Sequence, residues 1–278
     1  MGNTSGRPAY SGANEGDKTT RPRTTLNDSL AEERKEQKLE SPSVKITSMA
    51  FTSIDLERAH MDVEVEIHNP GKLGLNLVSM HILLDSDSRI LLAAKQDHAL
   101  SIVPNHVEFL KISLTIVYKN IQDRYPEIKP GQIIPYNLKL WPDYQKTLNV
   151  SKISIEKAGK LPFPLEPTVQ LKKASIYEIS MEQLSVRLQL KVENKNEFHF
   201  SVQKLDYNVV LSGEVVVSGS ASPKTVARSN SFQLTDLPIT FWPKNLLAAL
   251  FTIARGRGSG LTVQWKLHAY THFGPMQF

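Results

Sequence analysis

The chain has 278 residues, of which 40% are hydrophobic and 22% are charged, and its formal net charge is +5. This composition is typical of a soluble globular protein. The chain contains no cysteine, which excludes disulfides, thiolate metal sites and thiol catalysis. Its densest apolar run, residues 246–254, is far shorter than the roughly 20 residues that a membrane-spanning helix needs. We therefore expect a cytoplasmic protein.

Residues 1–42 form a separate region that is rich in Gly, Ser, Thr, Pro and charged residues. It holds too few aliphatic side chains to bury a core, so we expect a disordered polar tail. Gly2 follows Met1 as in myristoylated chains, but the sixth position of that pattern is Gly6 instead of Ser or Thr. Acylation of Gly2 is thus the alternative to a free tail, and a single acyl chain would bind membranes only marginally.

The rest of the chain contains one pattern twice. Residues 44–141 recur without a gap in residues 169–266, and the offset of 125 aligns Asn69 with Asn194 and Asn120 with Asn245. So long a period indicates two copies of a whole domain, because solenoid repeats span about 20 to 50 residues. We predict a tail over residues 1–42, one domain over 43–160 and a second domain over 161–278.

Within each copy, apolar residues alternate with polar ones, which is the pattern of half-buried antiparallel strands. In chain order the alternation covers residues 61–67, 73–77, 80–84, 110–116 and 136–140 of the first copy, and 186–192, 198–202, 205–209, 237–241 and 261–265 of the second. Many short strands separated by turn residues predict a mainly β protein with two tandem antiparallel β-sandwich domains.

One short helix is predicted in each copy. In the second copy, Pro243 and the favourable N-cap Asn245 precede the apolar run 246–254, and a glycine-rich stretch over 256–260 ends it. The first copy places residues 120–125 at the matching position. The predicted architecture is therefore a sandwich with one helix, repeated once.

Matching turns follow the first alternating strand of each copy, HNPG at residues 68–71 and ENKN at residues 193–196. Asparagine bonds its own backbone and tolerates a positive φ, while proline pre-sets the first position of a turn. A tight reversal into the next strand explains these residues fully. The structural motif that we single out consists of Asn69, Pro70, Asn194 and Asn196.

The sequence offers no reactive constellation. It has neither HExxH nor GxSxG, and no cysteine to accompany its scattered histidines. His268 and His272 stand four residues apart, which would bring metal ligands together on a helix, but their segment is expected to be a strand. We predict a non-enzymatic protein without catalytic, cofactor-binding or metal-binding residues.

The charge is distributed unevenly. Residues 158–278 hold 13 basic and 8 acidic residues, so the whole net charge of +5 lies in the second half of the chain. Arg255, Arg257 and Lys266, with Trp265 close in sequence, are candidates for a weak patch that binds anionic lipid or nucleic acid. We favour a solvated basic face with the tryptophans in the core, and we expect no specific nucleic-acid partner.

The Asn turn after an alternating strand identifies a family when it is taken together with longer segments. These are IKPGQIIPY (128–136), VENKNEF (192–198), LPITFWPKN (237–245), RGRGSG (255–260) and FGPM (273–276). Over residues 44–276 the chain resembles the water stress and hypersensitive response domain of the group 2 late embryogenesis abundant proteins of plants. It is most similar to their two-domain, desiccation-related branch. Lys195 departs from the pattern, since the family usually has proline at this position of the turn.

The resemblance implies an immunoglobulin-like or fibronectin-like sandwich that accumulates under stress and does not catalyse a reaction. We therefore expect a monomeric protective protein of the response to water deficit. It would act as a folded shield or weak chaperone through weak, non-specific contacts with labile client proteins or membrane surfaces. The alternative is a membrane-surface or anionic-lipid binding module that uses the basic second domain.

Overall fold

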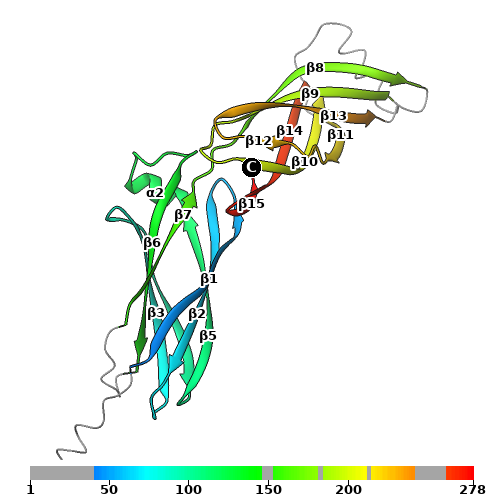
Figure 1. Ribbon diagram of the computed structural model, residues 1–278. Coiled ribbons are helices and arrows are strands. Elements are labelled where there is room, and N and C mark those ends of the chain that lie inside the picture. The colour runs from blue at the N-terminus through cyan, green and yellow to red at the C-terminus, as the bar shows by residue number, and fades with distance from the viewer. Residues whose placement is uncertain (1–40, 146–152, 181–183, 212–213, 242–260) are drawn as a thin grey trace, which may run out of the picture. The chain divides into compact units, whose positions relative to one another are not determined.

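The computed structural model describes residues 41–145, 153–180, 184–211, 214–241 and 261–278 (Figure 1). The chain divides into two units, residues 1–40 and Ser41–Phe278, and every described strand belongs to the second unit. The predicted disordered tail therefore lies almost wholly outside the described residues. Within those residues, no helix is both long and apolar enough to cross a bilayer.

The first copy forms two sheets (Figure 1). One contains β1 (Ser43–Ile54), β2 (Arg58–Asn69) and β5 (His106–Val117), and the other has the order β4 (Arg89–Ile102), β3 (Leu75–Ser86), β6 (Ile133–Tyr144), β7 (Ile155–Pro162). All pairings within these two groups are antiparallel. The sheets face each other across a buried core, where the Tyr136 hydroxyl on β6 reaches the Met61 sulfur on β2 at 3.5 Å.

The second copy repeats this arrangement. β8 (Thr168–Ile179), β9 (Leu184–Asn194) and β13 (Ser231–Phe241) form one sheet. The other has the order β11 (Glu214–Ala221), β10 (Phe200–Leu211), β14 (Leu261–Thr271), β15 (Gly274–Gln277), with β12 (Val226–Ala227) also on β10. β15 makes a single parallel pairing with β1, Met276 with Ile54, which joins two groups into an eight-stranded sheet. The prediction of a mainly β chain built of antiparallel sandwiches is confirmed, while the proposed domain limits stay a prediction.

The sequence placed the helix of the first copy two residues too late. The helix α2 spans Tyr118–Arg124, and its N-cap is Val117, which makes no side-chain cap. Asn120 is therefore inside the helix and does not cap it. Tyr118 instead fixes the start, because its buried hydroxyl donates to the Pro162 carbonyl at 2.8 Å. The helix predicted for residues 246–254 lies outside the described residues.

Interruptions of the strand register recur with the same offset of 125 as the sequence pattern. The bulges in the first copy fall at Ile46/Ser48, Phe51/Ser53 and Leu77/Ser79, and those in the second at Leu171/Lys173, Ile176/Glu178 and Val202/Lys204. Asn105 and Asn230, also 125 apart, both adopt a positive φ, 55° and 48°. Sequence alternation and backbone irregularity therefore follow one period.

A bulge also corrects one predicted boundary. The alternation over 73–77 and 80–84 was expected to mark two successive strands, but both belong to β3, and Leu73 lies before it with its side chain exposed. The bulge at Leu77/Ser79 inserts one extra residue, which shifts the inward phase from odd to even positions. Inward residues such as Leu77 and Ile82 consequently reach the same core.

Candidate functional site

The first asparagine of the predicted motif is a buried cross-link. Asn69 ends β2, and its amide nitrogen Nδ2 donates to three carbonyl oxygens, at Leu73 (2.8 Å), Ile102 (3.2 Å) and Val103 (3.3 Å). Its Oδ1 accepts from the Gly71 backbone N–H at 3.1 Å. One side chain therefore joins the turn after β2 to the end of β4.

Asn194 makes the same four contacts in the second copy. Its Nδ2 donates to the carbonyls of Phe198 (2.8 Å), Ala227 (3.2 Å) and Arg228 (3.1 Å), and its Oδ1 accepts from the Asn196 N–H at 3.0 Å. Each partner stands 125 residues after its counterpart around Asn69. A buried amide with every polar atom engaged has nothing left for a ligand, so its role is structural.

Asn196 adds a contact that Gly71 cannot make. Its Nδ2 donates to the Leu165 carbonyl at 2.8 Å, and its Oδ1 accepts from the Leu165 N–H at 2.7 Å. The segment before β8 is thereby tied to the turn. A bond between the turn asparagine and the local backbone was predicted, and the Gly71 N–H indeed donates to the Asn69 side chain, whereas the positive φ falls on other asparagines, Asn105 and Asn230.

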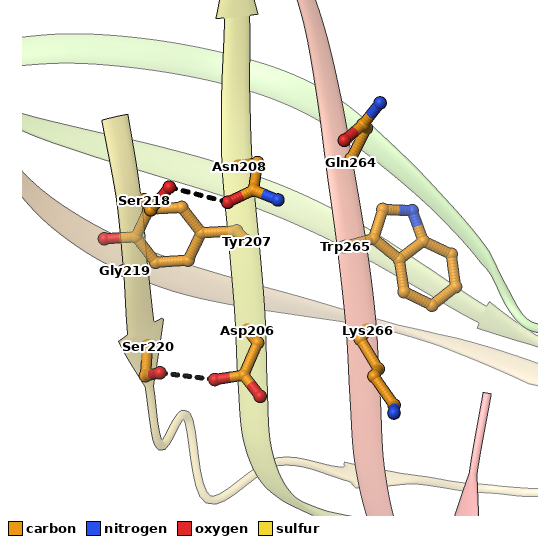
Figure 2. A pocket seen from close by; sticks show the side chains of 9 residues that line it. All are labelled: Asp206, Tyr207, Asn208, Ser218, Gly219, Ser220, Gln264, Trp265 and Lys266. Atoms are coloured by element: carbon orange, nitrogen blue, oxygen red, sulfur yellow. Dashed lines mark hydrogen bonds between the residues drawn. The ribbon is translucent and has the colours of Figure 1, made fainter. Parts of the chain in front are cut away.

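A shallow depression lies on the outer face of β11, β10 and β14, with a volume of about 670 Å³ (Figure 2). Alternation along each strand directs polar side chains to this face. They are Asp206 and Asn208 on β10, Ser218 and Ser220 on β11, and Gln264 and Lys266 on β14. Ser218 donates to the Asn208 amide oxygen at 2.7 Å, which leaves the nitrogen of that amide directed away from the serine.

Asp206 is the centre of charge in this depression. It accepts hydrogen bonds from Lys204 and Ser220 and contacts His268 Nε2 at 3.0 Å. The bonds from Lys204 and then Ser220 lower the pKa of Asp206 to about 2, despite some desolvation. This carboxylate is thus ionised at neutral pH and is a poor proton acceptor, which argues against acid–base catalysis at this place.

The candidate anion patch is only partly described. Lys266 is exposed and pairs across the ladder with Asp206, so it does not stand in a purely basic surrounding. Arg255 and Arg257 lie outside the described residues, and their grouping with Lys266 stays a prediction. Trp265 is half-buried and alternates with Lys266 along β14, as expected of a residue turned toward the core.

The depression holds hydroxyl, amide, carboxylate and ammonium groups without a reactive pair. No group of three or more His, Asp or Glu side chains in the described part of the chain is placed to hold a metal ion. His268 and His272 do not converge, since His268 contacts Asp206 and the His272 ring lies near that of His199. The sequence did not indicate either contact, because both partners lie more than 60 residues away.

Two sandwiches with buried asparagine turns define a class of β protein whose identity needs a comparison with known families. Residues 189–277 match the family model described as late embryogenesis abundant protein, LEA_2. These residues are therefore similar to the late embryogenesis abundant family of group 2 type. No curated protein matches the chain.

Solved structures give distant likenesses. The solution structure of a proposed late embryogenesis abundant (LEA) protein is 14% identical with a TM-score of 0.37, over 49% of this chain and 80% of that chain. A protein from Archaeoglobus fulgidus is 11% identical with a TM-score of 0.33, over 45% of this chain and 98% of that chain. Red sea bream transglutaminase is 10% identical with a TM-score of 0.28, over 93% of this chain and 34% of that chain. Scores this low carry no functional argument.

Proposed function

We propose that this chain is a non-enzymatic protective protein of the cytoplasmic response to desiccation, which shields labile proteins as a folded, monomeric sandwich protein. The match of residues 189–277 to the late embryogenesis abundant family carries this proposal. The cysteine-free composition supports it, because a chain without thiols cannot form disulfides or sulfenic acids during the oxidation that accompanies water loss. Separating client molecules from one another suppresses the apolar contacts that lead to aggregation.

Exposed apolar residues give the shield a means of contacting clients. Phe109 on β5 and Phe232 on β13 are 67% and 57% exposed, and each strand lies at the edge of its sheet. Val107 and Leu234 stand two residues away on the same outward face and are also exposed. The pairs 107/109 and 232/234 are 125 residues apart, so each sandwich carries one small apolar pair at the same place. Such small patches suit transient contacts better than stable complexes.

The test is the activity that a drying-sensitive enzyme recovers after dehydration and rehydration. We expect recovery well above that given by an equal mass of an unrelated folded sandwich protein. The double variant Phe109→Ser/Phe232→Ser should lose much of this gain, while Thr115→Ser/Thr240→Ser, exposed substitutions on the same two strands, should keep it. Recovery no better than with the unrelated sandwich would refute the shield.

The basic second half of the chain favours the alternative, a module that binds anionic lipid. Two of its lysines are already engaged, Lys191 with Glu193 at 3.5 Å and Lys204 with Asp206 at 2.8 Å, which reduces the charge available to a membrane. Retention on anionic but not neutral liposomes, abolished by salt, would establish this alternative. Equal behaviour on both liposomes would exclude it.

A further inference from the structure

Two histidines lie opposite each other, His199 directly before the start of β10 and His272 directly after the end of β14. The antiparallel ladder pairs Ser201 with Tyr270, and the same register continued by two residues brings His199 opposite His272. Their ring centroids are 5.8 Å apart with planes inclined by 32°. Directly opposite residues of an antiparallel pair have Cβ atoms about 4.5–5.5 Å apart, so both imidazoles start from neighbouring points.

The turn that carries His272 is fixed on both sides. The Thr271 hydroxyl accepts from the Phe273 N–H at 3.0 Å and donates to the Gly274 carbonyl at 3.1 Å. The Phe273 ring then packs edge-on against Phe198, with centroids 5.8 Å apart. Because Phe198 directly precedes His199, the two histidines are held by packed neighbours, while both of their own side chains remain exposed.

We propose that His199 and His272 together bind a divalent transition-metal ion of the class that prefers imidazole, with Cu²⁺ bound more tightly than Ni²⁺ or Zn²⁺. Imidazole nitrogen suits these three ions, and their affinities follow the general order in which Cu²⁺ is highest. Two imidazoles in neighbouring positions on one ion have centroids roughly 4.5–5 Å apart, the shorter value for the square-planar geometry of Cu²⁺, since each metal–nitrogen bond is about 2.0–2.1 Å long. The observed 5.8 Å is longer than this value, so the two exposed side chains must rotate towards each other to bind one ion.

A neighbouring positive charge also affects how strongly the two histidines would bind a metal ion. The positive charge of Lys160 acts on the His272 imidazole. The same Lys160 charge opposes a cation, so the site is weaker than one with three protein ligands. The described residues supply no third His, Asp or Glu to the cluster, and water would complete the coordination.

The experiment titrates the full, untagged chain with Cu²⁺ in the presence of glycine as a weak competitor, followed by calorimetry and visible circular dichroism. We expect one ion per chain. His199→Asn and His272→Asn should each weaken binding by at least about tenfold and remove the visible dichroism, and the double variant should resemble the singles. His106→Asn, an exposed histidine of the first sandwich, serves as the matched control and should bind like the unmodified chain.

Far-ultraviolet dichroism of each variant shows that the fold is intact. The inference is overturned if the chain binds no Cu²⁺, or if binding persists unchanged in both single variants. It is equally overturned if His106→Asn weakens binding as much as they do. None of these outcomes depends on drying protection, so failure of the metal site and failure of the proposed function are distinguishable.

Discussion

Removing the buried amide of Asn69 or Asn194 should destabilise the sandwich that contains it by about 2–4 kcal/mol. The Asn69 side chain makes four hydrogen bonds, the Asn194 side chain makes the same four and accepts a fifth from the Asn196 amide, and each is at most 1% exposed. At a net contribution of about 0.5–1.5 kcal/mol for each bond, four bonds give about 2–6 kcal/mol, and we expect the lower part of this range because the partly buried carbonyls regain water in the variant. Replacement by alanine also leaves the Ile102 or Ala227 carbonyl buried without this donor.

The assay is urea denaturation of Asn69→Ala and Asn194→Ala, followed by circular dichroism. If the two sandwiches unfold separately, each variant should shift a different transition, which would also test the predicted domain limits. Asn76→Ala is the matched control, because the side chain of this exposed asparagine makes its hydrogen bonds with Gln145 and Ser101 at the surface. We expect it to change the free energy of unfolding by less than about 0.5 kcal/mol. Equal effects of all three variants would refute the cross-link argument.

Two further predictions concern single positions. Gly159→Ala should destabilise the first sandwich by about 1–3 kcal/mol, because the added Cβ would overlap the Tyr136 ring on the neighbouring strand; an unchanged urea midpoint would contradict this. Asp206→Asn should alter the pH dependence of stability. The folded pKa is lowered to about 2 from an unfolded value near ~3.9, so the stabilisation by Asp206 exists above the unfolded pKa and disappears as pH falls toward 2. Urea midpoints measured from pH 5 to 2 should therefore fall less steeply in the variant, and parallel curves would exclude the effect.

Strand alternation allowed much of the fold to be predicted, most clearly in β2. Met61, Val63, Val65 and Ile67 are fully buried, as a period of two requires. β4 was missed because its inward positions include polar residues. Gln96 is one of them, and its side-chain amide donates to the Ser113 carbonyl at 3.0 Å. This hydrogen bond offsets the cost of turning a polar group inward. In the sequence, the same polar residue interrupts the alternating pattern.

The cross-strand sites could not be predicted for a different reason. The Asn69 amide bonds to a carbonyl 33 residues later, and His199 meets His272 across 73 residues. Neither distance is encoded by local propensity, since only the pairing of strands brings these residues together. The recurrence of asparagine at an offset of 125 was the available signal, and it located the residues without revealing what they bond.

The turn motif differs in sequence between the two copies, although its hydrogen bonds are the same. Pro70 and Lys195 occupy the same place, yet both neighbouring asparagines make the same four bonds, so the residue at this position does not determine them. Lys195→Pro should therefore change the free energy of unfolding by less than about 0.5 kcal/mol.

Asn196→Gly should behave differently, although it also restores the first turn's sequence. It removes both side-chain bonds to Leu165 and the bond from the Asn196 amide to Asn194 Oδ1, but it leaves the backbone N–H that Asn194 needs, and it should cost about 1–3 kcal/mol. Urea denaturation of the two single variants separates these roles. A large loss in Lys195→Pro with none in Asn196→Gly would show that the turn backbone, and not the link to Leu165, stabilises the second sandwich.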